Sequence, residues 1–147
     1  MSLLSLQWLC ILGMVAFAIR SGGRPEKIGS LIIAAASIID RAWHLLISAP
    51  VTATVDHWHF GLDLSMFAAA YALALKADRI WPMPFASTCL LAVLAHIARI
   101  IQLDMHPLVY AILSQVPFWL SIVTVLIGTY SYAWVQVSRS SRRPSSN

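Results

Sequence analysis

The stretch IGSLIIAAASIIDRAWHLLISA, residues Ile28–Ala49, decides the fold class of this chain. It contains no charged residue before Asp40, and it is long enough to cross a hydrocarbon core of about 30 Å, which takes about 20 residues. Its far half then carries Asp40, Arg41 and His44. The stretch therefore predicts a transmembrane helix whose charged residues need partners on neighbouring helices.

The composition of the whole chain agrees with a membrane protein. The 147 residues are 59% hydrophobic and 11% charged, whereas a soluble domain has about 25% charged residues. So few charges cannot cover a globule, and we predict an all-α, polytopic transmembrane helix bundle. Cys10 and Cys89 both lie in apolar runs and form no disulfide framework or metal-binding pair.

Five apolar windows of membrane-spanning length predict five helices, which together form one domain over residues 1–137. Four helices are expected instead if the first window is cleaved or lies at the interface. Ala16-Phe17-Ala18 resembles a signal-peptide cleavage site, but no basic residue precedes the apolar run, so we retain the helix. The last window can tilt, or kink at Pro117. The windows are Leu3–Ile19, Ile28–Ala49, Phe60–Leu75, Phe85–Ile101 and Leu108–Val135.

The lysines and arginines predict the orientation. All except Arg41 and Arg99 lie after the first and third windows or in the tail, and the connections Pro50–His59 and Gln102–Pro107 contain none. The positive-inside rule then places the N-terminus in the periplasm and the C-terminus in the cytoplasm. The net charge of +4 is thereby explained by topology rather than by nucleic-acid binding. Residues 138–147 are predicted to be a disordered basic tail.

Polar residues at membrane depth are the candidate site. If the second helix begins at Ile28, Asp40 lies about 18 Å along it. A charge at the centre of a membrane helix costs about 2.5–3.5 kcal/mol, so such residues pair or face a cavity. We predict one cluster in the outer half, with Asp40 paired to Arg99 and Asp63 to Arg41. Its members are Asp40, Arg41, His44, Asp63, His96 and Arg99.

Four uses of these residues stay open at this point. The first is a clasp between helices, without any cofactor. The second is a proton- or ion-coupled path through Asp40, His44 and His96. The third is a redox anchor that binds quinone, or b-type haem with His44 and His96 as axial ligands. The fourth is an outer metal ion such as Zn²⁺, held by Asp56, His57, His59 and Asp63.

Motifs for enzymatic chemistry are not found in the sequence. It contains no Gly-x-Ser-x-Gly elbow, phosphate-binding glycine-rich loop or zincin motif. Aromatic residues, Trp58 and Trp81 among them, flank the predicted helices and are expected at the membrane–water interfaces. Closely spaced alanines in the window Phe60–Leu75 predict a helix packed centrally in the bundle.

Three short motifs carry a resemblance to a group of known proteins. They are Gly-Gly-Arg-Pro-Glu-Lys at Gly22–Lys27, Asp-Arg-Ile-Trp-Pro at Asp78–Pro82, and Ala95-His96. In these motifs the chain resembles small polytopic inner-membrane proteins of proteobacteria that have no assigned function. The resemblance implies a bacterial inner membrane and supplies no catalytic residue. We therefore predict a non-enzymatic accessory subunit or assembly partner, which contacts lipid and other membrane subunits or copies of itself.

Overall fold

The computed structural model describes residues 3–46, 57–101 and 106–140. Over these residues the chain forms five α-helices and no strands, which confirms the predicted all-α bundle of five helices. The helices are α1 (Leu3–Ser21), α2 (Arg24–Leu46), α3 (His57–Lys76), α4 (Pro82–Ile101) and α5 (Pro107–Ser140).

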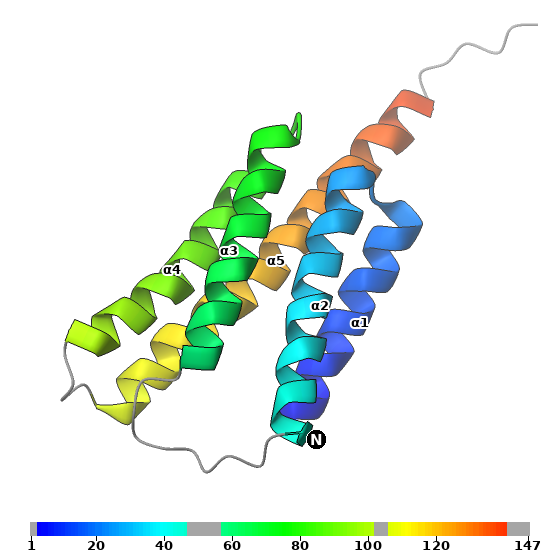
Figure 1. Ribbon diagram of the computed structural model, residues 1–147. Helices are drawn as coiled ribbons and strands as arrows, with labels where there is room; N and C mark the ends of the chain where they lie inside the picture. The colour runs from blue at the N-terminus through cyan, green and yellow to red at the C-terminus, as the bar shows by residue number, and fades with distance from the viewer. Residues whose placement is uncertain (1–2, 47–56, 102–105, 141–147) are drawn as a thin grey trace, which may run out of the picture.

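Four of the helices are long and apolar enough to cross a membrane, which makes this a multi-pass membrane protein. These are α2, α3, α4 and the Gln115–Ser140 part of α5. The apolar part of α1, Ser5–Ser21, is shorter. Nevertheless α1 runs lengthwise beside α2 and α5 and buries Ile11, Met14 and Ala18 (Figure 1).

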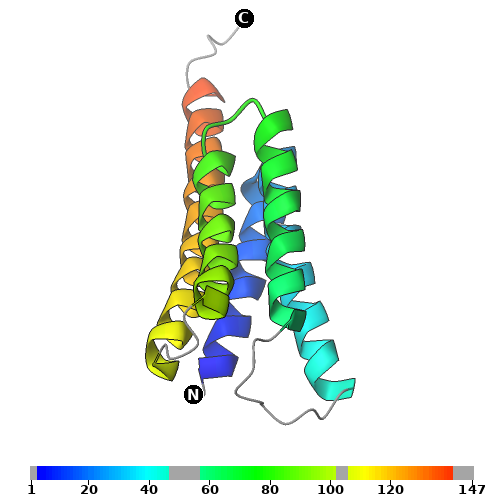
Figure 2. The same ribbon diagram turned by 60° about the vertical axis from the view of Figure 1, so that its left-hand side comes forward.

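The helices are arranged as two antiparallel pairs that meet where α2 packs against α3, and α5 packs against both pairs. Helices α1 and α2 form one pair and α3 and α4 the other, while α5 contacts α4, α1 and α2 (Figures 1 and 2). The buried side chains at the centre come from all five helices, and include Met14, Ile33, Met66, Phe85 and Val125.

The turn between α1 and α2 is shorter than the sequence predicts. Helix α1 extends to Ser21 and α2 already begins at Arg24, four residues before Ile28. Pro25 is suited to a helix start because its fixed φ is helical and its missing N–H would have no helical partner there. Gly22 is required by close approach, since an added Cβ would lie 2.6 Å from the carbonyl oxygen of Ala18. Asp40 consequently lies about 24 Å along α2 rather than about 18 Å.

Trp81 is a wedge at the end of the bundle where α1 meets α2. A Cβ added to Gly29 of α2 or Gly128 of α5 would lie 2.7 or 2.6 Å from its indole ring, so both glycines provide space for it. The indole Nε1 donates a 2.8 Å hydrogen bond to Oε1 of Glu26, a fully buried side chain of α2. The prediction that Trp81 belongs to an interfacial aromatic belt misses this packing role.

Helix α5 is longer than a bilayer crossing requires. Its 34 residues span about 51 Å, and it passes Pro117 without an interruption in the helix. Ser121 Oγ donates to the carbonyl oxygen of Pro117, at 2.9 Å. The helix ends at Ser140, inside the segment predicted to be a disordered tail, and residues 141–147 lie outside the described residues.

Candidate functional site

Asp40, His44 and His59 converge where α2 ends and α3 begins. Asp40 and His44 are four residues apart on α2 and therefore share a face of that helix, while His59 comes from the first turn of α3. Asp40 Oδ1 lies 3.0 Å from His59 Nε2 and 3.6 Å from His44 Nε2. The two Nε2 atoms are 3.3 Å apart. We call these three residues the Asp–His–His triad.

Two tryptophans adjacent in sequence to the histidines hold these helix ends together. Trp43 precedes His44 and Trp58 precedes His59. Their rings are stacked nearly parallel, with centroids 3.9 Å apart and planes inclined by 8°. An aromatic pair of this kind stabilises a contact by about 0.5–1.5 kcal/mol beyond the area it buries. The stack therefore sets the spacing and rotation of α2 and α3 beside the triad.

The carboxylate of the triad lies against both imidazoles. Its Oδ1 atom is 3.0 Å from His59 Nε2 and 3.6 Å from His44 Nε2, and the Asp40 side chain is only 35% exposed. A charged group in such surroundings is expected to pair. The triad can clasp α2 to α3 through protonated imidazole, or its three electron-pair donors can bind a cation.

A second carboxylate–imidazole pair lies further into the bundle. Asp63 Oδ2 of α3 is 3.1 Å from His96 Nε2 of α4. The His96 side chain is only 2% exposed and the Asp63 side chain 28%. Phe60 packs its ring edge-to-face with the imidazole, at a centroid distance of 5.8 Å. The pair therefore joins α3 to α4 in mostly apolar surroundings.

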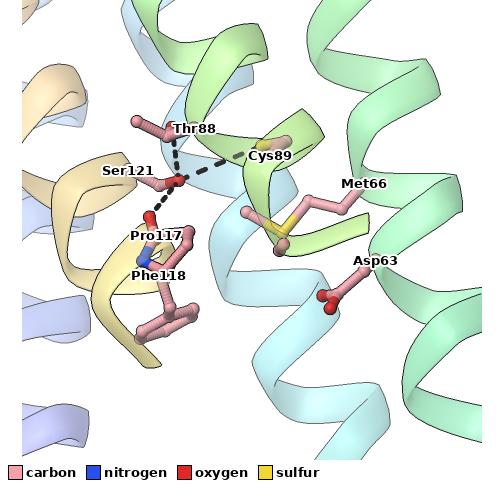
Figure 3. A pocket seen from close by; sticks show the side chains of 8 residues that line it. Asp63, Met66, Thr88, Cys89, Pro117, Phe118 and Ser121 are labelled. Carbon is pink, nitrogen blue, oxygen red and sulfur yellow. Dashed lines mark hydrogen bonds between the residues drawn. The ribbon is translucent and has the colours of Figure 1, made fainter. Parts of the chain in front are cut away.

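A small cavity adjoins Asp63 between α3, α4 and α5 (Figure 3). Its volume is about 20 Å³, enough for one water molecule. The hydroxyl oxygens of Thr88 and Ser121 are 2.8 Å apart at its wall, and Cys89 Sγ is 3.9 Å from that of Ser121. Figure 3 shows the Asp63 carboxylate directed toward this space from α3.

The predicted arginine partners of the carboxylates are wrong. Asp40 pairs with His59 and His44 instead of Arg99, and Asp63 pairs with His96 instead of Arg41. Depth along a helix determines height in the bundle but not the direction a side chain faces. The predicted single cluster thus separates into the α2–α3 triad and the α3–α4 pair, with Arg41 exposed on α2.

The cofactor hypotheses also divide between these two groups. His44 contacts Asp40 and His59, whereas His96 contacts Asp63 and Phe60. Of the predicted metal set, only His59 joins the described triad.

The other three members of that metal set are placed elsewhere or are not described. Asp63 pairs with His96, His57 is exposed at the start of α3, and Asp56 lies outside the described residues.

Sequence reasoning missed two polar contacts inside the bundle. Glu26 lies between Arg24 and Lys27 in sequence, a context that predicts an exposed polar connection rather than a buried acid. Thr88 and Ser121 gave no signal, because hydroxyl residues in membrane helices usually bond to their own backbone.

No protein-family model, curated protein or solved structure matches this chain. The resemblance to proteobacterial inner-membrane proteins therefore remains a prediction.

Proposed function

We propose that this protein is a non-enzymatic accessory subunit or assembly partner of a complex in a bacterial inner membrane. Its N-terminus faces the periplasm and its C-terminus the cytoplasm. The clustering of basic residues supports this orientation under the positive-inside rule. They lie on the α1–α2 turn, the α3–α4 connection and the end of α5, at the upper end in Figure 1, and include Arg20, Arg24, Lys76, Arg79 and Arg139.

The use made of the polar residues supports a packing role rather than catalysis. Asp40 and His59 join α2 to α3, and Asp63 and His96 join α3 to α4. The hydroxyls of Thr88 and Ser121 join α4 to α5 in the same way. Interhelical hydrogen bonds and close packing drive helix association in lipid, where no hydrophobic force between helices acts. The polar side chains thus clasp the helices of the bundle.

A lateral groove between α2 and α3 is the observation that carries the proposal. Its volume is about 430 Å³, and its wall is mostly apolar, with Arg24 and Lys76 at the basic end of the bundle. We assign the groove to an apolar helix of a partner subunit, and this helix ends in a carboxylate. The alanines of the wall let the two helix backbones approach closely, and the positive charges of Arg24 and Lys76 complement the carboxylate. The remaining wall residues include Ile28, Ile32, Ala69, Ala72 and Leu73.

The test is a tagged purification from native membranes in a mild detergent, scored for a stoichiometric companion. Ala72→Leu fills the groove and should reduce recovery of the companion several-fold. Ala16→Leu is the matched control, because Ala16 is exposed on α1 and the described wall of the groove contains no α1 residue. This control should retain the companion at the wild-type ratio.

Three results would contradict the assignment to a partner helix. A protein that purifies alone from its native membrane has no such subunit. Equal recovery of the companion with both variants would place the partner on another surface. Recovery of phospholipid alone, lost in Ala72→Leu, would make the groove a lipid site.

A proton- or ion-coupled path is the second candidate, and the cavity beside Asp63 favours it. A water-sized space next to a carboxylate–imidazole pair is a usual component of a relay. Asp63→Asn should then abolish proton flux in proteoliposomes while the fold is retained. Ser65→Ala, on the exposed side of α3, is the control. Wild-type vesicles no leakier than protein-free vesicles would exclude this candidate.

A further inference from the structure

We propose that Asp40, His44 and His59 form a binding site for a divalent transition metal of the Zn²⁺ type, at the end of the bundle opposite the basic residues. The site is distinct from the metal set predicted from sequence. It also goes beyond the accessory role, because it requires no partner protein.

The ligand chemistry fits such an ion. Two imidazoles and one carboxylate are a usual protein ligand set for zinc when a fourth position is left to water or substrate. Calcium and magnesium prefer oxygen ligands, and in larger number. Imidazole nitrogen suits zinc and its neighbours among the divalent transition metals. The residue types therefore select this class of cation.

The spacing of the three atoms is that of a tetrahedral site. Ligand atoms about 2.0–2.1 Å from a tetrahedral zinc ion lie about 3.3–3.4 Å from one another. The corresponding distances in the triad are 3.0, 3.3 and 3.6 Å. A point about 2.05 Å from all three atoms would lie about 0.7 Å out of their plane, as in a tetrahedron with one vertex open. The ion thus needs little rearrangement to enter.

The convergence of the three atoms on one point is a further indication. Asp40 Oδ1 faces the Nε2 atoms of His59 and His44, at 3.0 and 3.6 Å. A cation between the three atoms would bind this oxygen and both nitrogens at once. The His44 side chain is 45% exposed, so the site can be reached from solvent or from the headgroup layer.

The surrounding structure fixes the positions of the ligands in advance. Asp40 and His44 are held one turn apart on α2, and the stacked rings of Trp43 and Trp58 hold the start of α3 against it. A site supported on helices and by packed neighbours is more precise than one supported on loops. Binding would tie the end of α2 to the start of α3.

The experiment uses the full-length protein in detergent, with any histidine tag removed, and Zn²⁺ as the probe. The protein is stripped with a chelator and dialysed, then titrated with Zn²⁺ against a chromophoric competitor. We expect one equivalent to bind. His44→Ala and His59→Ala should each weaken binding by at least tenfold, because each removes one of three ligands.

His57→Ala is the matched control, since His57 is exposed two residues before His59 and outside the triad. It should bind Zn²⁺ with wild-type affinity. Co²⁺ supplies a second readout, because its visible spectrum reports coordination number and should indicate a tetrahedral or five-coordinate site. Gel filtration and circular dichroism identify any variant that fails to fold, and His44→Ala, at an exposed position, should fold.

Three results would overturn the proposal. One is a wild-type protein that retains no stoichiometric Zn²⁺. Another is unchanged affinity in folded His44→Ala, which would mean adventitious binding elsewhere. The third is loss of binding in His57→Ala with retention in His44→Ala, which would return the site to the sequence-predicted set.

Discussion

Substitution of Gly128 by alanine tests the packing of the Trp81 wedge. The added Cβ would lie 2.6 Å from two ring atoms of Trp81 and 2.9 Å from a third, closer than non-bonded carbons approach. The indole is also hydrogen-bonded to Glu26 and in contact with Gly29, so it cannot withdraw without losing those contacts. Gly128→Ala should therefore force the α2–α5 contact apart.

The magnitude follows from two opposing effects. Alanine in place of a helical glycine stabilises by about 0.5–1 kcal/mol when nothing obstructs the methyl group. Overpacking a filled interior costs about 1–3 kcal/mol. Gly61→Ala and Gly13→Ala measure the first effect alone, because no atom lies within 4 Å of their added Cβ. Relative to these controls, Gly128→Ala should lower the free energy of unfolding by about 1–3 kcal/mol.

The assay is equilibrium unfolding in mixed micelles, followed by circular dichroism, for the three glycine variants and the wild type. Trp81→Phe and Gly128→Ala together should cost less than the sum of their separate losses, since the smaller ring relieves the clash. A Gly128→Ala protein as stable as Gly61→Ala would refute the wedge.

Three further predictions concern the ends of the bundle. Trp81→Phe removes the hydrogen-bond donor to buried Glu26 and should lower the free energy of unfolding by about 1–3 kcal/mol. The control Trp134→Phe, at a site 64% exposed, should lower it by almost nothing. Equal losses in the two variants would show that the hydrogen bond does not contribute to stability. Trp43→Leu removes the Trp43–Trp58 ring stack beside the triad and should weaken Zn²⁺ binding measurably, with one equivalent still bound. Unchanged affinity would mean that the stack does not position the ligands. In a background without native cysteines, Ser140→Cys should react with an impermeant thiol reagent only in inverted membrane vesicles, and labelling in intact spheroplasts would reverse the proposed orientation.

The helices could be predicted because hydropathy and length are local properties of the chain. All five windows became helices, and the main error was the start of α2, where Pro25 permits a helix to begin inside an apparently polar connection. That shift of four residues places Asp40 about 24 Å along α2 instead of about 18 Å.

The candidate site was less predictable for a geometric reason. Sequence gives the height of a residue in the bundle, but partner choice depends on how each helix is rotated about its own axis. Asp40 therefore met His59 rather than Arg99, and Asp63 met His96 rather than Arg41. The role of Trp81 could not be predicted for a similar reason. Its position beside a predicted helix fits a tryptophan at the membrane interface as well as one packed between Gly29 and Gly128.

The most direct test of the accessory role is photocrosslinking from the groove in intact native membranes. A photoreactive amino acid at Ala72 samples the groove, and one at Ala16 samples the exposed face of α1. We predict one discrete protein adduct from Ala72 that is much weaker from Ala16. Adducts to lipid alone from both positions would contradict a partner subunit in this groove.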